Sequence, residues 1–336
     1  MDFRLTDDQV ALRDGIRSYC DGQLPPEKLG ALAAAGGFDR ALWSGVAEIG
    51  VFGLRRAESE GGIGLGMADA VLVFSELARR LVPGPLVWTH LAAGLVPGAA
   101  SGDAIVGGLD LAGALGEPHL VEHFSELDTL LVLHADRVEQ LDPRALKSEP
   151  IATPLDPLTP LHRVLDLPAG ERLGGADLVA RLRLEGAALT AALSLGIAEM
   201  AQELATAYAK QREQFGRAIA GFQSIKHMLA DMFVRQEMAR AAVWSAGATM
   251  DQAGVGDPAR AVASAKVVAG DAAMKNARAC IQIHGGMGYT WEMAPHYYLK
   301  RAWVLSTCFG TSEEHEEALA QGLSRGPHAR TTPPSK

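Results

Sequence analysis

The sequence predicts a mainly α-helical protein with a small β domain in the middle of the chain. Residues 177–212 contain no proline and are rich in Ala and Leu, a composition typical of a long helix. Between residues 103 and 176, short apolar runs alternate with proline-rich pieces, a pattern typical of strands and turns. We therefore expect an N-terminal helical domain (1–102), a small middle β domain (103–176), a C-terminal four-helix bundle (177–325) and a disordered tail (326–336).

The N-terminal part has the signals of several helices. Thr6 and Gln9 form a capping box in front of a helix whose apolar residues share one face. A second helix fits residues 38–50 and ends at Gly50, and a third begins at Met67. The loop between them, GGIGLG, follows a helix rather than a strand and lacks the third glycine of a dinucleotide fingerprint. We interpret it as a structural loop.

In the β region, the pieces AIVGGLDLAG, TLLVLHA and HRVLDL fit short strands. The stretch PHLVEH matches the H-x-x-E-H pattern of some zinc peptidases, with His119 and His123 four residues apart. No long helix is expected there to hold two such ligands on one face. We therefore expect solvated surface histidines and no metal site.

After residue 177 we expect helices at about 177–212, 222–251, 258–283 and 295–306, and two connecting segments stand out. QREQFGRAIAGFQSIKH carries Arg212, whose guanidinium can bind a phosphate bidentately, and the following helix start adds its dipole. In IQIHGGMGYTWE, three glycines after a helix let the backbone approach a ligand closely. An ordinary helix connection and a glycine C-cap are the alternatives for these two segments.

Composition excludes several classes of function. The net charge of −9 argues against a general nucleic-acid or anionic-membrane surface. No apolar run approaches the roughly 20 residues that span a bilayer, and the first residues are too polar for a secretory signal. Three well-separated cysteines suggest neither a disulfide framework nor a zinc ribbon. We expect a cytoplasmic protein.

Taken together, the segments resemble the acyl-CoA dehydrogenase family over nearly the whole chain. FRLTDDQVALRDGIRSY is similar to the family's opening helix, and LWSGVAEIGVFGLRRAESEGGIGLGMADAVLVFSELAR to its N-terminal helical domain. YAKQREQFGRAIAGFQSIKHMLADM and ARACIQIHGGMGYTWEMAPHYYLKRA are close to its two bundle signatures. The resemblance implies an acyl-CoA dehydrogenase-like fold, non-covalent FAD bound across a subunit interface, and electron-transfer flavoprotein as the electron acceptor.

The resemblance also implies which residues contact FAD. It assigns Arg212, Gln214 and Phe215 to the pyrophosphate and adenosine region, with Phe222 and Gln223 nearby. It assigns a second group to the dinucleotide of the neighbouring subunit: Gln282, Ile283, His284, Gly285 and Gly286. Thr311, Ser312 and Glu313 match a third family segment that touches FAD.

Two departures from the family pattern concern the flavin ring and the catalytic base. Family members wrap the ring with a threonine–glutamate–proline–glycine–serine stretch and a tryptophan–isoleucine–threonine stretch. Here GLDLAGALGEPHL stands near the first, we find no match to the second, and the β domain looks shorter than in full-length relatives. The family's usual base is a glutamate in a tyrosine–glutamate–glycine–threonine run, which here reads Cys308–Phe309–Gly310–Thr311. We call residues 308–311 the elbow, because Gly310 can take the conformation that a bend needs and Thr311 or Ser312 can cap a following helix.

Phenylalanine cannot accept a proton, so Phe309 cannot be the base. Some members use a glutamate on the first long bundle helix instead, and an ungapped count back from Arg212 places that position at Gly186. Glu185 is one residue away, which turns a helix by about 100° and faces its side chain elsewhere. Glu185 is therefore a candidate catalytic base only if the register slips, and otherwise a solvated or ion-paired helix residue.

These features are similar to those of the short β subunits in actinobacterial α2β2 steroid-degrading acyl-CoA dehydrogenases. The resulting hypothesis is an assisting subunit that lends FAD contacts to a full-length α subunit. The complex would desaturate a bulky, steroid-like acyl-CoA. Two alternatives remain open at this point. One is a self-sufficient homo-oligomeric dehydrogenase that uses Glu185, and the other is a structural paralogue that binds no FAD.

Overall fold

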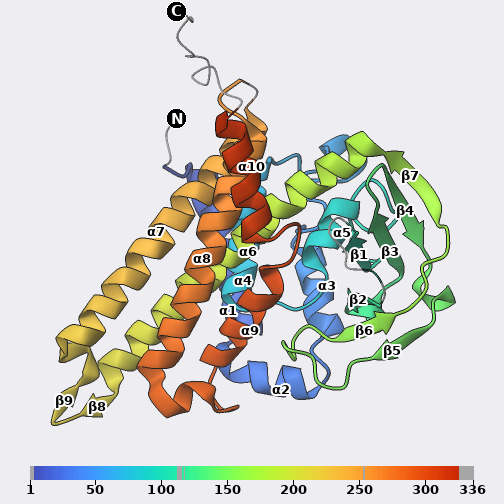
Figure 1. Cartoon of the computed structure of the whole chain (residues 1–336). Coiled ribbons are helices and arrows are strands. Elements are labelled where there is room, and N and C mark those ends of the chain that lie inside the picture. The colour runs from blue at the N-terminus through green and yellow to red at the C-terminus, as the bar shows by residue number, and fades with distance from the viewer. Residues whose placement is uncertain (1–3, 112–115, 117, 253, 325–336) are drawn as a thin grey trace, which may run out of the picture.

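The computed structural model of the chain describes residues 4–111, 116, 118–252 and 254–324. It has an N-terminal group of helices, a middle region of strands, and a C-terminal group of long helices, in the order that the sequence predicts (Figure 1). The expected disordered tail, 326–336, lies outside the described residues. The division into domains at 102 and 176 stays a prediction, although β7 ends and α6 begins at Gly175–Ala176.

The described residues of the N-terminal part form five α-helices. They are α1 (Asp7–Gln23), α2 (Leu29–Ala34), α3 (Arg40–Glu48), α4 (Met67–Arg79) and α5 (Leu86–Ala92). The predicted capping box is confirmed: the Gln9 N–H donates to Thr6 Oγ1 and the Thr6 N–H donates to Gln9 Oε1, both at 3.2 Å. Helix α4 is buried along most of its length, because it packs against both α6 and α7 of the bundle.

Where the structure describes it, the middle region folds into two small sheets. Four strands, in the order β1-β3-β4-β7, form the first: β1 (Val106–Asp110), β3 (Thr129–Leu133), β4 (Arg137–Leu141) and β7 (Glu171–Gly175). Strands β1 and β3 are parallel, and the other pairs are antiparallel. The second sheet is antiparallel, in the order β2-β6-β5: β2 (His119–Glu122), β6 (Leu161–Val164) and β5 (Ser148–Pro150).

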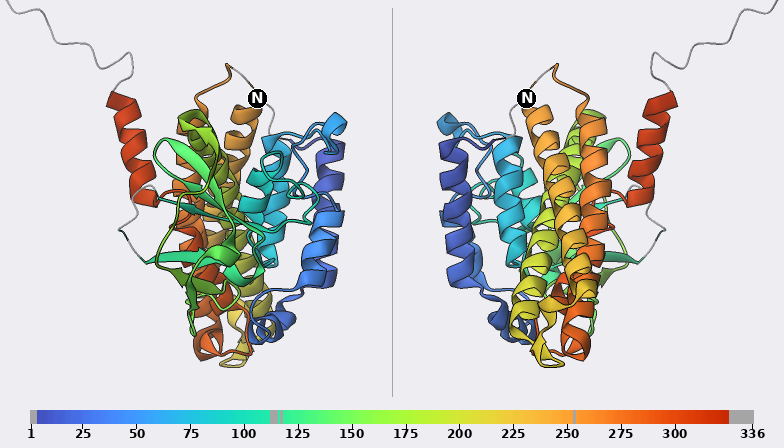
Figure 2. Two further views of the ribbon diagram at one scale, coloured as in Figure 1. Left: turned by 90° about the vertical axis from the view of Figure 1, so that its right-hand side faces the viewer. Right: turned by 90° about the vertical axis from the view of Figure 1, so that its left-hand side faces the viewer.

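The C-terminal part is built on α6 (Ala176–Gln211), α7 (Gln223–Asp251), α8 (Pro258–His284) and the shorter α9 (Pro295–Leu305), followed by α10 (Ser312–Ser324). A two-stranded hairpin, β8 (Glu213–Gln214) and β9 (Arg217–Ala218), joins α6 to α7. Short 3₁₀ segments are η1 (Pro26–Lys28), η2 (Glu58–Glu60), η3 (Phe124–Glu126), η4 (Pro143–Ala145), η5 (Ile219–Gly221) and η6 (Gly285–Tyr289). The N-terminal helices cover one side of the bundle, and α10 stands on the opposite side (Figure 2).

Helix α6 forms the centre of the core and corrects one expectation. By length and composition it is apolar enough to cross a membrane, contrary to our reading that no run approaches that length. However, 89% of its most apolar window is buried inside the fold, as in a core helix of a globular protein. One hydrophobic cluster runs through the N-terminal helices, the strands and the bundle.

A buried ion-pair network fastens α4 to the bundle. Arg79 on α4 contacts the carboxylates of Glu76 (3.3 Å), Glu199 (3.3 Å) and Glu203 (2.7 Å). Arg17 of α1 also pairs with Glu76, and Arg240 of α7 with Glu199. All three side chains at the centre of this network are buried: Arg79, Glu76 and Glu199. Their charges are therefore stabilised by one another rather than by water.

Candidate functional site

The elbow is a sharp turn between α9 and α10. Phe309 and Gly310 both have left-handed backbone conformations, with φ of 53° and 97°. Only glycine fits at 310, because a Cβ there would lie 2.8 Å from the His315 ring. The Thr311 hydroxyl accepts from the Glu314 N–H, and Glu314 accepts from the Thr311 N–H, which is the cap that the sequence predicts at the start of α10. A left-handed phenylalanine is uncommon and often marks a functional turn.

The Phe309 side chain points into the protein and is 8% exposed. Its ring lies 4.6 Å from the Trp88 ring, between centroids. It also covers Gly186 on α6 so closely that a Cβ at 186 would come within 2.3 Å of the ring. One aromatic ring therefore fills both positions at which the family resemblance would place a catalytic glutamate.

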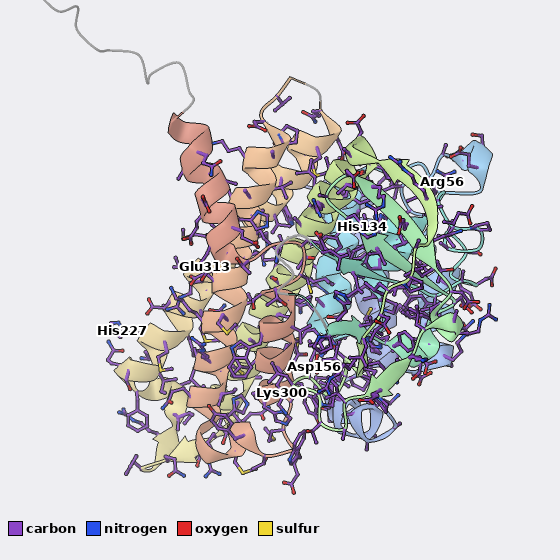
Figure 3. The ribbon with its side chains drawn as sticks, turned by 45° about the vertical axis from the view of Figure 1, so that its right-hand side comes forward. Arg56, His134, Asp156, His227, Lys300 and Glu313 are labelled. Atoms are coloured by element: carbon purple, nitrogen blue, oxygen red, sulfur yellow. The ribbon has the colours of Figure 1, made fainter. Side chains whose placement is uncertain are left out.

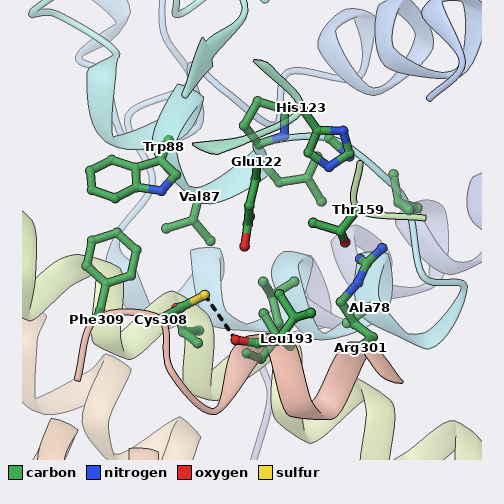
Figure 4. Close-up of a pocket in the computed structure, with 17 residues that line it drawn as sticks. Ala78, Val87, Trp88, Glu122, His123, Thr159, Leu193, Arg301, Cys308 and Phe309 are labelled. Atoms are coloured by element: carbon green, nitrogen blue, oxygen red, sulfur yellow. Dashed lines mark hydrogen bonds between the residues drawn. The ribbon is translucent and has the colours of Figure 1, made fainter. Parts of the chain in front are cut away.

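Beside Phe309 lies a small cavity of about 50 Å³, lined by residues of α4, α5, β2, α6 and α9. Figure 4 shows Trp88 and Phe309 on one side of it, Cys308 and Leu193 below, and the Glu122 carboxylate pointing into its middle. A cavity of this size holds a few water molecules, whereas an acyl chain or a flavin ring needs several times the space.

Glu122 is a candidate functional residue that the sequence analysis missed. Its carboxylate makes no hydrogen bond or ion pair within the part of the chain that the structure describes, although Arg301 also lines the cavity. Arg301 is instead engaged with the buried Asp156 at 2.5 Å. Burial raises the pKa of Glu122, with Arg301 opposing and Asp156 adding to the shift. Glu122 is the glutamate of the H-x-x-E-H match, but that pattern does not indicate this position, because the residues around the carboxylate come from distant parts of the chain.

We expect Glu122→Gln to stabilise the protein at pH 8. The pKa of Glu122 is higher in the folded chain than in the unfolded chain, so its ionisation weakens folding as pH rises through the folded pKa. Below the unfolded pKa this cost is absent. The thermal midpoint should rise by roughly 2–4 °C at pH 8, which corresponds to about 1 kcal/mol, and much less at pH 4.

Glu149→Gln, at an exposed position on β5, is the matched control. It should leave the thermal midpoint unchanged at both pH 8 and pH 4. A Glu122→Gln variant that is less stable than the parent at both pH values would show that the carboxylate makes a stabilising contact, against this account.

Glu185 does not reach the cavity beside Phe309. Its carboxylate is held by both terminal nitrogens of Arg55, at 3.0 and 3.2 Å, and its side chain is largely buried. It lines a different cavity, with residues of α5 and the loop after α3. Glu185 is thus ion-paired and lies away from the elbow, and its role as a base stays a prediction.

The first group of predicted FAD residues lies around the β8–β9 hairpin, at the lower end of the bundle in Figure 1. Arg212 is exposed, and its guanidinium forms no ion pair among the described residues. Phe215 is 93% exposed, and Phe222 lies 6.1 Å from it and 4.1 Å from the Arg217 guanidinium. Gln214 and Gln223 are also exposed. A cation and an unburied aromatic ring side by side suit a nucleotide that approaches from outside this chain.

The second group lies at the end of α8, where the His284 ring stacks on Tyr208 of α6 at 4.1 Å. Ile283 and His284 are each 5% exposed, so their side chains belong to the core, and burial lowers the pKa of His284. Only their backbones could touch a ligand. Gln282, Gly285 and Gly286 are exposed, and a Cβ at either glycine would meet open space.

The third group, Thr311, Ser312 and Glu313, starts α10 and lies apart from the hairpin (Figure 1). Figure 3 labels Glu313 at the start of α10. One chain therefore presents two surfaces. This arrangement suits contacts with two different dinucleotides, as expected if FAD lies across subunit interfaces.

The expectation of solvated histidines in PHLVEH is wrong for His123. Its side chain is 2% exposed, and its Nε2 accepts a hydrogen bond from the Gly84 N–H at 3.3 Å. Burial lowers its pKa to about 3, so it is neutral. The stretch forms β2 rather than a helix, and no group of three metal-ligating side chains occurs in the described ranges.

The residues fit one end of FAD and not the other. The free Arg212 guanidinium and the open backbone at Gly285 and Gly286 suit a pyrophosphate. The space beside the elbow, by contrast, is closed by Phe309 and Trp88 and does not fit an isoalloxazine ring. Part of the stretch that would wrap the ring, residues 112–115 and 117, lies outside the described residues.

Comparison with known proteins gives a consistent result. The model of the acyl-CoA dehydrogenase C-terminal domain matches residues 175–324, and that of the N-terminal domain matches residues 6–103. The chain is 33% identical to acyl-CoA dehydrogenase IpdE2 of Mycobacterium tuberculosis over 318 residues, which cover 88% of this chain and 91% of that protein.

Two solved structures have the same fold over nearly the whole chain. The ChsE4–ChsE5 complex from Mycobacterium tuberculosis matches with a TM-score of 0.83 and 22% identity, over 97% of this chain and 100% of that chain. Tcur3481–Tcur3483, described as a steroid ACAD, matches with a TM-score of 0.82 and 21% identity, over 96% and 99%.

Proposed function

This chain belongs to the acyl-CoA dehydrogenase family, and we propose that it is the assisting subunit of a heteromeric, FAD-dependent acyl-CoA dehydrogenase. In this proposal a full-length α subunit supplies the flavin-ring pocket and the base. This chain supplies the Arg212 surface and the glycine backbone at 285–286, which hold the outer part of the same FAD. FAD would provide the hydride acceptor for α,β-desaturation of the acyl-CoA.

The observation that carries the proposal is the position of Phe309. A base in this reaction must be a carboxylate that reaches the α-proton of the thioester. Here the elbow position is aromatic, and its ring covers Gly186, the alternative position on α6. The remaining cavity is too small for the reacting part of an acyl-CoA. The chain thus keeps the family fold while its own reaction site is closed.

The competing readings account for less of the structure. A self-sufficient enzyme with Glu185 as base would need that carboxylate released from Arg55 and moved to the other cavity. An FAD-free paralogue would leave no role for an exposed Arg212 and Phe215 beside an open glycine backbone. Exposed cations and aromatics of this kind suit an interface that closes over a ligand.

The substrate class and partners extend this proposal. A bulky, steroid-like acyl-CoA is supported by the resemblance to short steroid-pathway subunits, and a heteromer by the similarity in fold to a chain of the ChsE4–ChsE5 complex. The same resemblance supports an α2β2 heterotetramer, electron-transfer flavoprotein as the electron acceptor, and a cytoplasmic location. They are part of the proposal.

Arg212→Ala tests the contribution of this chain to FAD binding. In the complex with the full-length subunit, we expect FAD occupancy to fall at least about fivefold, because a charge-assisted contact with phosphate is worth roughly 1–3 kcal/mol. FAD occupancy is measured as the flavin absorbance per mole of protein after extensive dialysis. Arg260→Ala, exposed at the start of α8, is the control and should leave occupancy unchanged. Full occupancy in Arg212→Ala would remove Arg212 from the site.

A further inference from the structure

A second, polar cavity of about 100 Å³ lies between the start of α6, α5 and the loop after α3. Its lining includes three arginines, Arg55, Arg56 and Arg181, together with His90 and Glu185. Arg56, labelled in Figure 3, lies on the opposite side of that view from His227 and the hairpin end of the bundle. This cavity is therefore separate from the surface that we assign to FAD.

Positive charge exceeds negative charge around this cavity. Glu185 pairs with Arg55 at 3.0 Å, and Glu60, outside the lining, pairs with Arg56 at 2.7 Å. Arg181 is exposed and forms no ion pair in the part of the chain that the structure describes. Both paired arginines keep further N–H donors, because each guanidinium carries five.

His90 adds a hydrogen-bond acceptor to the cavity lining. Its side chain is 4% exposed, and its Nδ1 hydrogen-bonds to the Val51 carbonyl at 3.0 Å. Nδ1 is thus the donor, while Nε2 has no partner among the described residues, although the ring lines the cavity. Nε2 is not among the fully buried polar atoms, so it is open to the cavity and can accept from a water or from a bound group there.

We propose that this cavity binds a small oxyanion, a phosphate or carboxylate group, held by Arg181 and by the free donors of Arg55 and Arg56, with His90 beneath it. The volume suits a group of phosphate or carboxylate size rather than a whole nucleotide. An anion oxygen that carries a proton, or an ordered water, donates to His90 Nε2. Burial lowers the pKa of His90 to about 4, so the ring is neutral and its Nε2 can accept a hydrogen bond.

Titration with inorganic phosphate, followed by calorimetry on the full chain at fixed ionic strength, tests the proposal. We expect saturable binding of one phosphate per chain and an affinity at least about fivefold weaker in Arg181→Gln. Arg163→Gln removes an exposed arginine of β6 that pairs with no described group, and it should leave the affinity unchanged. Competition by acetate would assign the site to carboxylates, and its absence would assign it to phosphates.

No saturable binding, or equal affinity in the parent chain and Arg181→Gln, would overturn the proposal. An equal loss in Arg163→Gln would overturn it too, because the effect would then be general charge screening. Arg181 has no structural partner among the described residues, so the variant should fold, which circular dichroism checks. The test involves no flavin, so its outcome is independent of the assisting-subunit proposal.

Discussion

Replacing Arg79 with methionine should destabilise the protein by about 3–5 kcal/mol, as expected when one partner of a buried ion pair is removed. Arg79 is 7% exposed and contacts three carboxylates, two of which, Glu76 and Glu199, are themselves buried. Methionine fills much of the same volume without the charge. The loss therefore comes from carboxylates left short of positive charge in the interior.

The effect should be visible in urea unfolding of the purified chain as a lower midpoint. Arg144→Met is the control, because Arg144 pairs with Asp142 on the surface, where such a pair contributes about 0–1 kcal/mol. Equal losses in the two variants would mean that the network does not fasten α4 to α6 and α7 as described.

Replacing Gly186 with alanine should cost about 1–3 kcal/mol, although alanine is normally the better helix former. The added Cβ would come within 2.3 Å of the Phe309 ring, which is itself packed against Trp88 and cannot easily move away. In a Phe309→Ala background the space is open, so the same substitution should be tolerated. A double-mutant cycle measures this coupling.

Gly15→Ala is the matched control, because Gly15 lies inside α1 with nothing near the position of a Cβ. It should be neutral or slightly stabilising. If Gly186→Ala were equally harmless in the parent chain, Phe309 would not fill the position above α6. The argument that both base positions are closed would then fail.

Much of the fold could be predicted because its signals are local. The Thr6–Gln9 cap, the helix that begins at Pro258 and the proline-free stretch that becomes α6 are all written in neighbouring residues. The elbow was also predictable, since Gly310 and Thr311 give the turn and the cap. The residue types at the hairpin and the glycine run pointed to a phosphate-binding surface for the same reason.

What could not be predicted depends on contacts between distant segments. The Glu122 carboxylate lies near Arg301 and Asp156 only because β2, α9 and the loop before β6 meet in the fold. Burial of Ile283 and His284 depends on α6 packing against α8, which places Tyr208 over the His284 ring. The Phe309 ring covers Gly186 only because the elbow packs against α6. This packing closes both positions at which the family resemblance would place a base.

The most direct test of the assisting-subunit account is the flavin content and activity of the chain, produced alone and together with a full-length acyl-CoA dehydrogenase as its partner. The account predicts a colourless, inactive chain alone. It predicts a yellow complex that desaturates an acyl-CoA only when both chains are present. A chain that binds FAD and dehydrogenates an acyl-CoA by itself would contradict the account.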